Sequence, residues 1–401
     1  MTYFSDRLDA FGRIEQYRLA KESGYWPYYK TVESAALPRL IIEGKEAINF
    51  GSNNYLSLSY HPAVIEATIE ATNRFGSGVT GSRLLNGTLD LHNQLESELA
   101  AFYGTESALV FATGYVANLS TIAGLLGKKD FAVADKEVHN SLLTGVQLSG
   151  ARMKRFRHND VEHLAKILAG LPSEAGKGVL VDGVYSMGGD TAPLKEIVEL
   201  CRSTPNTFLL DDEAHGLGVL GERGRGAAEH YGVLDDIDLF TITFSKTLGS
   251  CGGALVGSAA AVELLTLTSD TLIFTASNTP GSVAAALAAL RILVAEPERP
   301  ARLRQNVTDF VAMLGERGVS TNPAESAIVT VPLKRFDEVS TVLLAIDLLE
   351  NGVFVNPVIP PAVTRDAGLI RLSLMVDHDT EILEEAADIM TKVLIDHDQL
   401  S

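Results

Sequence analysis

Lys246 stands among small and apolar residues, with no acidic neighbour, in the segment TITFSKTLGSCGGA (residues 241–254). A lysine in such a setting is costly to bury unless its nitrogen is used. Apolar surroundings lower the pKa of an amine and so favour Schiff-base chemistry. Gly249, Gly252 and Gly253 leave space for a ligand nearby. The segment therefore predicts a lysine that binds an aldehyde covalently.

A second polar group, DDEAHG (residues 211–216), follows an apolar stretch and supplies Asp212 and His215. Taken alone, either residue is typical of a turn or a helix cap, and that alternative stays open. Together with Lys246 they match pyridoxal 5′-phosphate, whose ring nitrogen needs a carboxylate to stay protonated and draw electrons. The hydroxyls of Thr243 and Ser245 suit its phosphate or phenolic oxygen. The set predicts this cofactor.

Two further segments fit the same cofactor. In ATGYVAN (residues 112–118) an apolar stretch runs through Gly114 and Tyr115 into a helical pattern. A helix N-terminus of this kind presents backbone N–H groups to an anion. His139 follows another apolar stretch, and its flat imidazole could stack on a pyridine ring. An ordinary strand–helix turn and a structural histidine remain the alternatives.

The elements that must position these residues are short apolar segments. They lie at residues 108–114, 130–135, 178–186, 208–216, 239–246 and 252–257. Helical patterns alternate with several of them, for example at 160–171 and 194–203. Strands alternating with helices predict a mostly parallel α/β sheet. Chemistry in such sheets gathers at the carboxyl ends of the strands.

The pattern changes after Pro280. Long helices with a break at Pro297 and Pro300 are followed by apolar strands, a helix near 336–351 and a final helix near 379–395. These elements predict a smaller α+β domain. We therefore predict an N-terminal segment (1–45), a large cofactor-binding α/β domain (46–285) and a C-terminal α+β domain (286–401).

Composition excludes several classes of function. The 401 residues are 46% hydrophobic and 21% charged, which is typical of a globular protein. A formal net charge of −18 argues against nucleic-acid binding through a global positive field. Cys201 and Cys251 lie far apart, so we expect neither a disulfide framework nor a metal site. Because the sequence shows no signal core and no run of about 20 apolar residues, we expect a cytoplasmic protein without a transmembrane segment.

Two motif matches are set aside. The segment GSGVTG (residues 76–81) matches a dinucleotide fingerprint, but a helical pattern precedes it where a strand is needed. The segment GVYSMG (residues 183–188) has one residue too many for a nucleophile elbow. Neither a dinucleotide site nor a serine hydrolase is expected.

Several segments together resemble the α-oxoamine synthase family of fold-type I pyridoxal-phosphate enzymes, and within it the bacterial serine palmitoyltransferases. The resemblance runs nearly end to end. It is carried by NFGSNNYLSL, GSGVTGSRLLNGTLDLHNQLESELAAFYG, FATGYVANL, DGVYSMGGDTAPL, LDDEAHGLGVLGERGRG, TFSKTLG, IFTASNTP, GVFVNPVIPPAV and LIRLSLM. It implies a mostly parallel central sheet with helices on both faces, plus the smaller C-terminal domain.

The resemblance implies a role for each residue of the cofactor site. Lys246 would form the Schiff base and later move the Cα proton, and Asp212 would pair with the pyridine nitrogen. His215 and Ser186 would bond near the phenolic oxygen. His139 would stack on the ring and donate a hydrogen bond to the substrate or the thioester carbonyl.

It also implies the anion sites. Backbone amides at Gly114 and Tyr115, with the Thr243 hydroxyl, would hold the phosphate. Arg371 and Asn54 would hold the amino-acid carboxylate.

A homodimer with its active site at the interface is implied as well. The partner subunit would reach the phosphate through the segment Thr275 to Ser277. Its middle residue, often threonine in the family, is Ala276 here.

The implied reaction is a decarboxylative Claisen-type condensation of an amino acid with an acyl thioester, giving an α-amino ketone. Serine and a long-chain acyl-CoA are favoured, with a product like 3-ketosphinganine, as in sphingolipid biosynthesis. Glycine or alanine with another acyl-CoA or an acyl-carrier-protein thioester stays open, as in 8-amino-7-oxononanoate synthase or glycine C-acetyltransferase. Transamination, aldol cleavage and a catalytically silent homologue are further alternatives.

The sequence departs from the family near substrate-facing loops. Ile359 stands where some serine palmitoyltransferases have a carboxylate-binding arginine, and Thr364 replaces a proline. Residues 376–379 read Val-Asp-His-Asp instead of Ala-Thr-His-Thr, and Thr247 stands where serine is frequent. These changes leave the cofactor residues intact and bear on the substrate.

Overall fold

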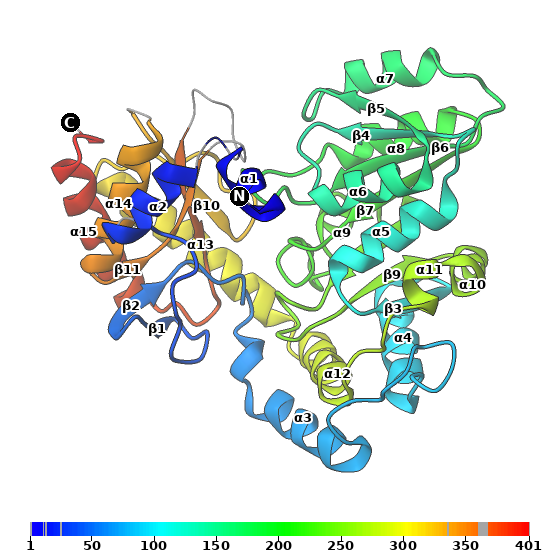
Figure 1. The fold of residues 1–401 in the computed structure, drawn as a ribbon, viewed down its shortest axis with the longest axis horizontal. Helices are drawn as coiled ribbons and strands as arrows, with labels where there is room; N and C mark the ends of the chain where they lie inside the picture. Colours follow the sequence, from blue (N-terminus) through cyan, green and yellow to red (C-terminus); the bar gives the residue numbers. More distant parts are fainter. Residues whose placement is uncertain are drawn as a thin grey trace.

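The computed structural model describes residues 2–10, 12, 14–24, 26–334, 337–359 and 368–400. It contains a seven-stranded sheet, which lies on the right in Figure 1. The strand order is β3-β9-β8-β7-β6-β4-β5. Strand β9 is antiparallel to both neighbours, and the other adjacent pairs are parallel. The strands are β3 (Ser107–Phe111), β4 (Phe131–Asp135), β5 (Arg152–Phe156), β6 (Lys177–Asp182), β7 (Thr207–Asp212), β8 (Leu239–Thr243) and β9 (Gly253–Gly257).

Helices cover both faces of this sheet. The connections through α5 (Gly114–Leu125) and α6 (Asn140–Ser149) run towards the β5 edge, whereas those through α7 (Val161–Ala169) and α8 (Leu194–Ser203) run back towards β7. Because such crossovers are right-handed, the two pairs of helices lie on opposite faces. The predicted α/β class, with a mostly parallel sheet and helices on both faces, is confirmed.

Each of the six predicted apolar segments contains a strand. Strand β5, RMKRF, was not among them because it lacks an apolar run. It lies at the sheet edge, where one side of the strand has no neighbour and a basic sequence is tolerated.

The C-terminal part joins long helices to a second, small sheet. Its elements are α12 (Pro280–Ala295), α13 (Glu298–Glu316), β10 (Ile328–Pro332), α14 (Glu338–Glu350), β11 (Val353–Phe354), β12 (Asn356–Val358), β13 (Leu369–Ser373) and α15 (Thr380–Asp396). Strands β10, β13 and β12 form an antiparallel sheet. The helix break lies at Glu296 and Pro297. The predicted break at Pro300 is wrong, because this proline lies in the first turn of α13, where its missing N–H costs no helical bond.

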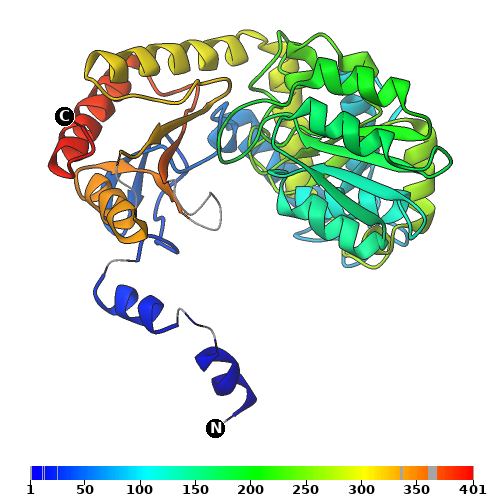
Figure 2. The ribbon, with the colours of Figure 1, turned by 90° about the horizontal axis from the view of Figure 1, so that it is seen from above.

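The N-terminal helices α1 (Tyr3–Asp9) and α2 (Ile14–Glu22) extend away from the rest of the chain (Figure 2). Strands β1 (Arg39–Ile42) and β2 (Lys45–Asn49) follow, and β2 pairs in parallel with β11. Residues 39–49 thereby share a sheet with the C-terminal part. The domain limits at residues 45 and 285 stay a prediction.

The remaining helices are η1 (Leu58–Tyr60), α3 (Pro62–Phe75), α4 (Asp90–Tyr103), α9 (Ala227–His230), η2 (Leu234–Asp236), α10 (Ala259–Thr268) and α11 (Asp270–Ile273). Among them, α3 packs against α12. The segment GSGVTG follows helix α3, not a strand, as its sequence context predicts. Within the described ranges no single helix is long and apolar enough to cross a bilayer; α12 and α13 reach that length and composition only together, across an 81° bend.

Candidate active site

The register of the large sheet sets three polar side chains side by side. Asp182 pairs with Asp212 between β6 and β7, and Asp212 pairs with Thr241 between β7 and β8. Lys246 follows shortly after the end of β8. All four line one cavity of about 260 Å³ at the carboxyl ends of these strands, where parallel sheets place their chemistry.

The cavity brings together most of the predicted cofactor residues. These are Gly114, Tyr115, His139, Ser186, Asp212, His215, Thr243 and Lys246. It also includes residues that sequence reasoning did not assign, among them Thr113, Asn118, Asp182 and Thr241. The predicted residues Asn54, Thr275, Ser277 and Arg371 lie outside this lining.

Lys246 has an amine that is unusually easy to deprotonate. Burial lowers its pKa from 10.5 to about 8, although the charges of Asp212 and Asp182 oppose this effect and that of Arg371 adds to it. A substantial fraction of the amine is therefore neutral near pH 8. A neutral amine is the form that attacks a carbonyl or accepts a proton.

The Asp212 carboxylate is buried and held from two sides. Its Oδ2 accepts a hydrogen bond from Asn118 Nδ2 at 2.6 Å, and its Oδ1 accepts one from the Ala214 N–H at 2.9 Å. Asn118 Oδ1 in turn accepts from the Thr241 hydroxyl at 2.6 Å. Asn118 fixes the carboxylate, and its only sequence signal is its place one turn into the helix that begins at Gly114.

Asp182 is a second acid beside Asp212. Burial raises its pKa well above the usual range, and the charge of Asp212 raises it further. Both of its oxygens accept the His139 N–H, at 3.2 and 3.1 Å. It thus fixes the backbone at the start of α6. The sequence could have identified Asp182, because it ends the apolar segment of β6 just as Asp212 ends that of β7.

A chain of hydrogen bonds connects Asp212 to His139. Asn118 Nδ2 donates to Ser141 Oγ at 2.9 Å as well as to Asp212, and Ser141 Oγ lies 2.7 Å from His139 Nδ1. The imidazole meets the Tyr115 ring edge to face, with centroids 6.1 Å apart. The orientation of His139 is therefore coupled to the carboxylate.

His215 forms a buried pair with Tyr55. Its Nδ1 lies 2.6 Å from the Tyr55 hydroxyl oxygen. Burial lowers the pKa of His215 well below 6.5, and the charges of Lys246 and Arg371 lower it further. Burial also raises the pKa of Tyr55 to about 12, against the lowering effect of Arg371. Both side chains are uncharged near neutral pH and can serve as hydrogen-bonding groups.

An anion cradle lies at the N-terminus of α5. Thr113 caps the helix by accepting the Val116 N–H at 3.1 Å. A Cβ on Gly114 would lie 2.7 Å from Thr243 Cβ, so only glycine allows this approach to β8. The Thr243 and Ser245 hydroxyls lie 2.8 Å apart at the same place. Free N–H groups of a first helical turn together with hydroxyls suit a phosphate.

Arg371 on β13 is buried and nearly fully oriented by protein groups. Its Nε donates to the Ser186 carbonyl at 2.6 Å, and its other two nitrogens donate to Ser373 Oγ at 2.8 Å and Asn53 Oδ1 at 3.2 Å. Each of those two terminal nitrogens carries a second N–H. The contact of Arg371 with a substrate carboxylate stays a prediction.

Asn54, predicted to act with Arg371, has its side chain bonded elsewhere. Its Nδ2 donates to the Ala36 carbonyl at 2.9 Å, and its Oδ1 accepts the Ser59 N–H at 3.2 Å. The asparagine that contacts Arg371 is Asn53. A substrate role for Asn54 stays a prediction.

Thr275 and Ser277 follow α11, away from this chain's own cavity. Ser277 Oγ lies 3.1 Å from His92 Nε2, and Ala276 forms a β-bridge with Ser82. Their predicted contact with the phosphate of a partner subunit stays a prediction. The departure at Thr364 lies outside the described residues.

Comparison with known proteins agrees with this geometry. Residues 45–390 match the family Aminotransferase class I and II. The chain is 38% identical to a serine palmitoyltransferase of Sphingobacterium spiritivorum over 389 residues, covering 97% of this chain and 96% of the relative. It is 40% identical to an 8-amino-7-oxononanoate synthase of Geobacter sulfurreducens over 385 residues, covering 95% and 97%.

A solved structure shares the whole fold. A high-resolution structure of SPT with its PLP internal aldimine superposes with a TM-score of 0.94 at 36% identity, covering 100% of both chains. The predicted fold-type I architecture is confirmed. The chain belongs to the aminotransferase class I and II family and, within it, to the α-oxoamine synthases that its sequence resembles.

Proposed function

We propose that this chain is a pyridoxal-phosphate-dependent acyltransferase that condenses serine with a long-chain acyl-CoA, with loss of carbon dioxide. One observation carries the proposal: Lys246, Asp212 and the α5 cradle line a single cavity, and Arg371 is bonded to a residue of its wall. The similarity to serine palmitoyltransferases over nearly the full chain supports the choice of substrates.

The residues present fit this cofactor. Lys246 offers an amine to the aldehyde, Asp212 a fixed carboxylate to the ring nitrogen, and the first turn of α5 with Thr243 a site for the phosphate. When bound, pyridoxal phosphate withdraws electrons from the bonds at the amino-acid Cα. His215 and Ser186 lie on the cavity wall where they can bond the phenolic oxygen.

Proton transfer at the substrate Cα belongs to Lys246. A general base works best when its pKa is near the working pH, and the pKa of this amine is about 8. Arg371 orients the substrate by its carboxylate, because its guanidinium is itself held at three points. His139 lines the same cavity, and in this proposal it donates a hydrogen bond to the incoming carbonyl.

Arg371→Ala is expected to raise the amino-acid KM by about 10- to 100-fold, since a charge-assisted hydrogen bond is lost. Steady-state kinetics with varied serine would measure the change, and the thioester KM should stay close to wild type. Arg317→Ala, which removes a surface arginine paired with Asp388, is the matched control. An unchanged serine KM in Arg371→Ala would mean that another group anchors the carboxylate.

The choice of amino acid can be tested directly. The purified holoenzyme would be titrated with serine, glycine and alanine while the cofactor absorbance is followed. Acyl-CoA substrates of increasing chain length would then be added with serine. We expect free thiol to be released from the thioester and carbon dioxide from serine. A response to glycine or alanine but not serine would favour the 8-amino-7-oxononanoate synthase or glycine C-acetyltransferase type, and the Geobacter relative supports the first of these. No response to any amino acid would favour a silent homologue.

We also propose a homodimer that works in the cytoplasm, in sphingolipid biosynthesis. Leu85 and Phe274, with exposed fractions of 80% and 81%, lie beside the bridge between Ser82 and Ala276. Burying such an apolar surface in a second copy would bring Thr275 and Ser277 to the interface. Sedimentation at micromolar concentrations would test this state. An acyl carrier protein as thioester donor remains the alternative, and turnover with an acyl-carrier-protein thioester but with none of the acyl-CoA substrates would favour it.

A further inference from the structure

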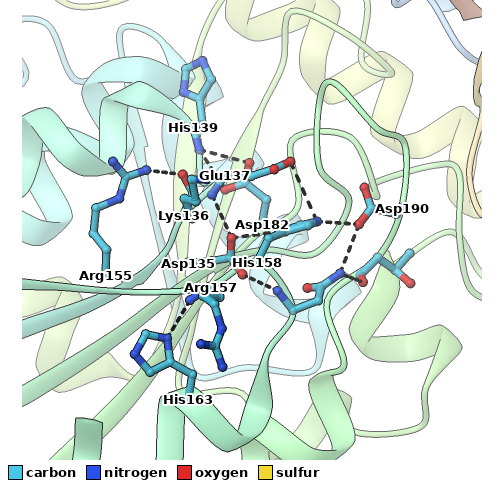
Figure 3. A network of polar contacts seen from close by, with 12 residues as sticks. Asp135, Lys136, Glu137, His139, Arg155, Arg157, His158, His163, Asp182 and Asp190 are labelled. Carbon is cyan, nitrogen blue, oxygen red and sulfur yellow. Dashed lines mark hydrogen bonds and ion pairs between the residues drawn. The ribbon is translucent and has the colours of Figure 1, made fainter. Parts of the chain in front are cut away.

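His158, just after the edge strand β5, lies between two carboxylates (Figure 3). Its Nδ1 is 2.9 Å from Asp135 Oδ1, and its Nε2 is 2.7 Å from Asp190 Oδ2. A carboxylate accepts hydrogen bonds, so both ring nitrogens must donate at once. Only the charged imidazolium has two donors, and the geometry therefore describes a cation shared by two anions.

The two carboxylates lie on two different segments, each of which leads to a residue that lines the cavity. Asp135 ends β4, and His139 lies four residues beyond it; Asp190 lies four residues beyond Ser186 in the loop after β6. The neighbouring Asn159 also bonds to both carboxylates. Its N–H donates to Asp135 Oδ2 at 2.8 Å, and its Nδ2 donates to Asp190 Oδ2 at 3.0 Å. The turn after β5 thus joins the two loops.

The loop after β6 is a tight hairpin with Ser186 near its tip. The Tyr185 N–H donates to the Asp190 carbonyl, and the Gly189 N–H donates to the Tyr185 carbonyl, each at 2.9 Å. The Ser186 carbonyl accepts the Arg371 Nε–H at 2.6 Å. A displacement of Asp190 would therefore move Tyr185 through the first of these bonds, and the adjacent Ser186 carbonyl would then move the Arg371 guanidinium.

The same hairpin is tied to the C-terminal part that carries Arg371. Glu325 Oε2 accepts from the Thr191 N–H at 2.9 Å and from its hydroxyl at 2.7 Å, and Ser326 Oγ donates to the Gly189 carbonyl at 2.7 Å. The limb of the hairpin at residues 189–191 is thus fixed by the C-terminal part through Gly189 and Thr191, and by His158 through Asp190. This limb is bonded to Tyr185, the residue before Ser186.

We propose that His158 is a positioning residue for Arg371: as a cation between Asp135 and Asp190 it fixes the hairpin whose Ser186 carbonyl orients the guanidinium. This inference rests on the proposed role of Arg371 as the carboxylate anchor. His158 touches no reacting atom. Its effect is on the affinity for the amino acid.

The charges around His158 support a permanent cation at neutral pH. Burial lowers its pKa, but hydrogen bonds and charges from Asp135 and Asp190 outweigh burial and raise the pKa from 6.5 to about 10. The Glu137 carboxylate lies 3.8 Å from His158 Nε2. The Tyr185 ring packs edge to face on the imidazole, with the ring centroids 4.5 Å apart. A raised pKa adds stability that is fully present below pH 6.5 and lost as pH rises towards 10.

The test compares His158→Gln with wild-type holoenzyme. Glutamine keeps a hydrogen-bonding side chain of similar length but no charge. We expect the serine Kd, from spectral titration at about pH 7.5, to rise roughly 10- to 100-fold, because a displaced guanidinium weakens its charge-assisted hydrogen bond to the carboxylate. Cofactor content should be retained. Relative to wild type, the midpoint of thermal unfolding should fall most at low pH, and the difference should vanish towards pH 10.

Two variants sharpen the test. Asp190→Asn should raise the serine Kd similarly. The double variant His158→Gln/Asp190→Asn should have a serine Kd no higher than that of the single variant with the higher Kd, because both changes break the same contact. His397→Gln is the matched control, because His397 pairs with Asp347 on the surface at 2.6 Å and touches neither loop. It should leave the serine Kd unchanged.

An unchanged serine Kd in His158→Gln would overturn the inference, even if the variant unfolds at a lower temperature. If wild-type holoenzyme responds to no amino acid, the proposed function fails, and a crystal structure of His158→Gln decides the inference separately. A displaced Arg371 guanidinium would support it. An intact hydrogen bond from Arg371 Nε to the Ser186 carbonyl would overturn it.

Discussion

Lys246→Ala is expected to lose both turnover and the absorbance at about 420 nm that a lysine-bound pyridoxal group gives. Lys246 is the lysine of the cavity lining, and a substantial fraction of its amine is neutral near pH 8. Activity should fall by about 10³-fold or more, since both the covalent link and the proton carrier are removed. Absorbance spectra and thioester turnover would measure the two effects separately.

Two further variants separate loss of the amine from loss of the charge. Lys246→Arg keeps a cation but has no neutral amine at working pH, so it should be as inactive as Lys246→Ala. Lys195→Ala removes an exposed lysine on α8 and should behave as wild type. A yellow, active Lys246→Ala protein would disprove the assignment of this residue.

Asp212→Asn should retain much of the cofactor and lose about 10³-fold in turnover, because the ring nitrogen no longer faces a carboxylate. The amide also replaces an acceptor by a donor. Asn118 Nδ2 and the Ala214 N–H both donate to Asp212, so one N–H group would face another. Cofactor content by absorbance and turnover with saturating substrates would check both statements.

Asp212→Asn also changes the environment of the neighbouring acid, Asp182. The charge of Asp212 helps to raise the pKa of Asp182, so neutralising Asp212 should lower that pKa towards its usual range. Comparison with Asp212→Asn/Asp182→Asn would show whether Asp182 supplies residual activity. Asp388→Asn, at a surface ion pair, is the control. Normal turnover in Asp212→Asn would count against its pairing with the ring.

Much of the fold was predictable because buried strands are apolar and end in small or polar residues. Such a pattern locates β4, β6, β7 and β8, yet it does not say which strands are neighbours. Asp182 and Asp212 lie side by side only through the pairing of β6 with β7. Asp182 and Asn118 were therefore missed, although both lie in segments that carry predicted site residues.

The substrate side of the site was harder to predict. Asn53 and Asn54 are adjacent and identical in type, so the sequence cannot tell which one turns towards Arg371. The loop decides this, because it turns the Asn54 side chain towards the Ala36 carbonyl and the Ser59 N–H. Contacts made by a second chain, as predicted for Thr275 and Ser277, depend on an assembly that one chain does not contain.

The pairing of β2 with β11 sets an order of events during synthesis. Strand β2 leaves the ribosome early, but its partner β11 begins only at Val353. This small sheet can therefore be completed only when almost the whole chain has been made. The strands that carry Asp212 and precede Lys246 are complete by Gly257. A growing chain can therefore assemble its cofactor-binding half before β13 and Arg371 have been translated. The proposed anchor for the amino acid is therefore the last part of the site to be made.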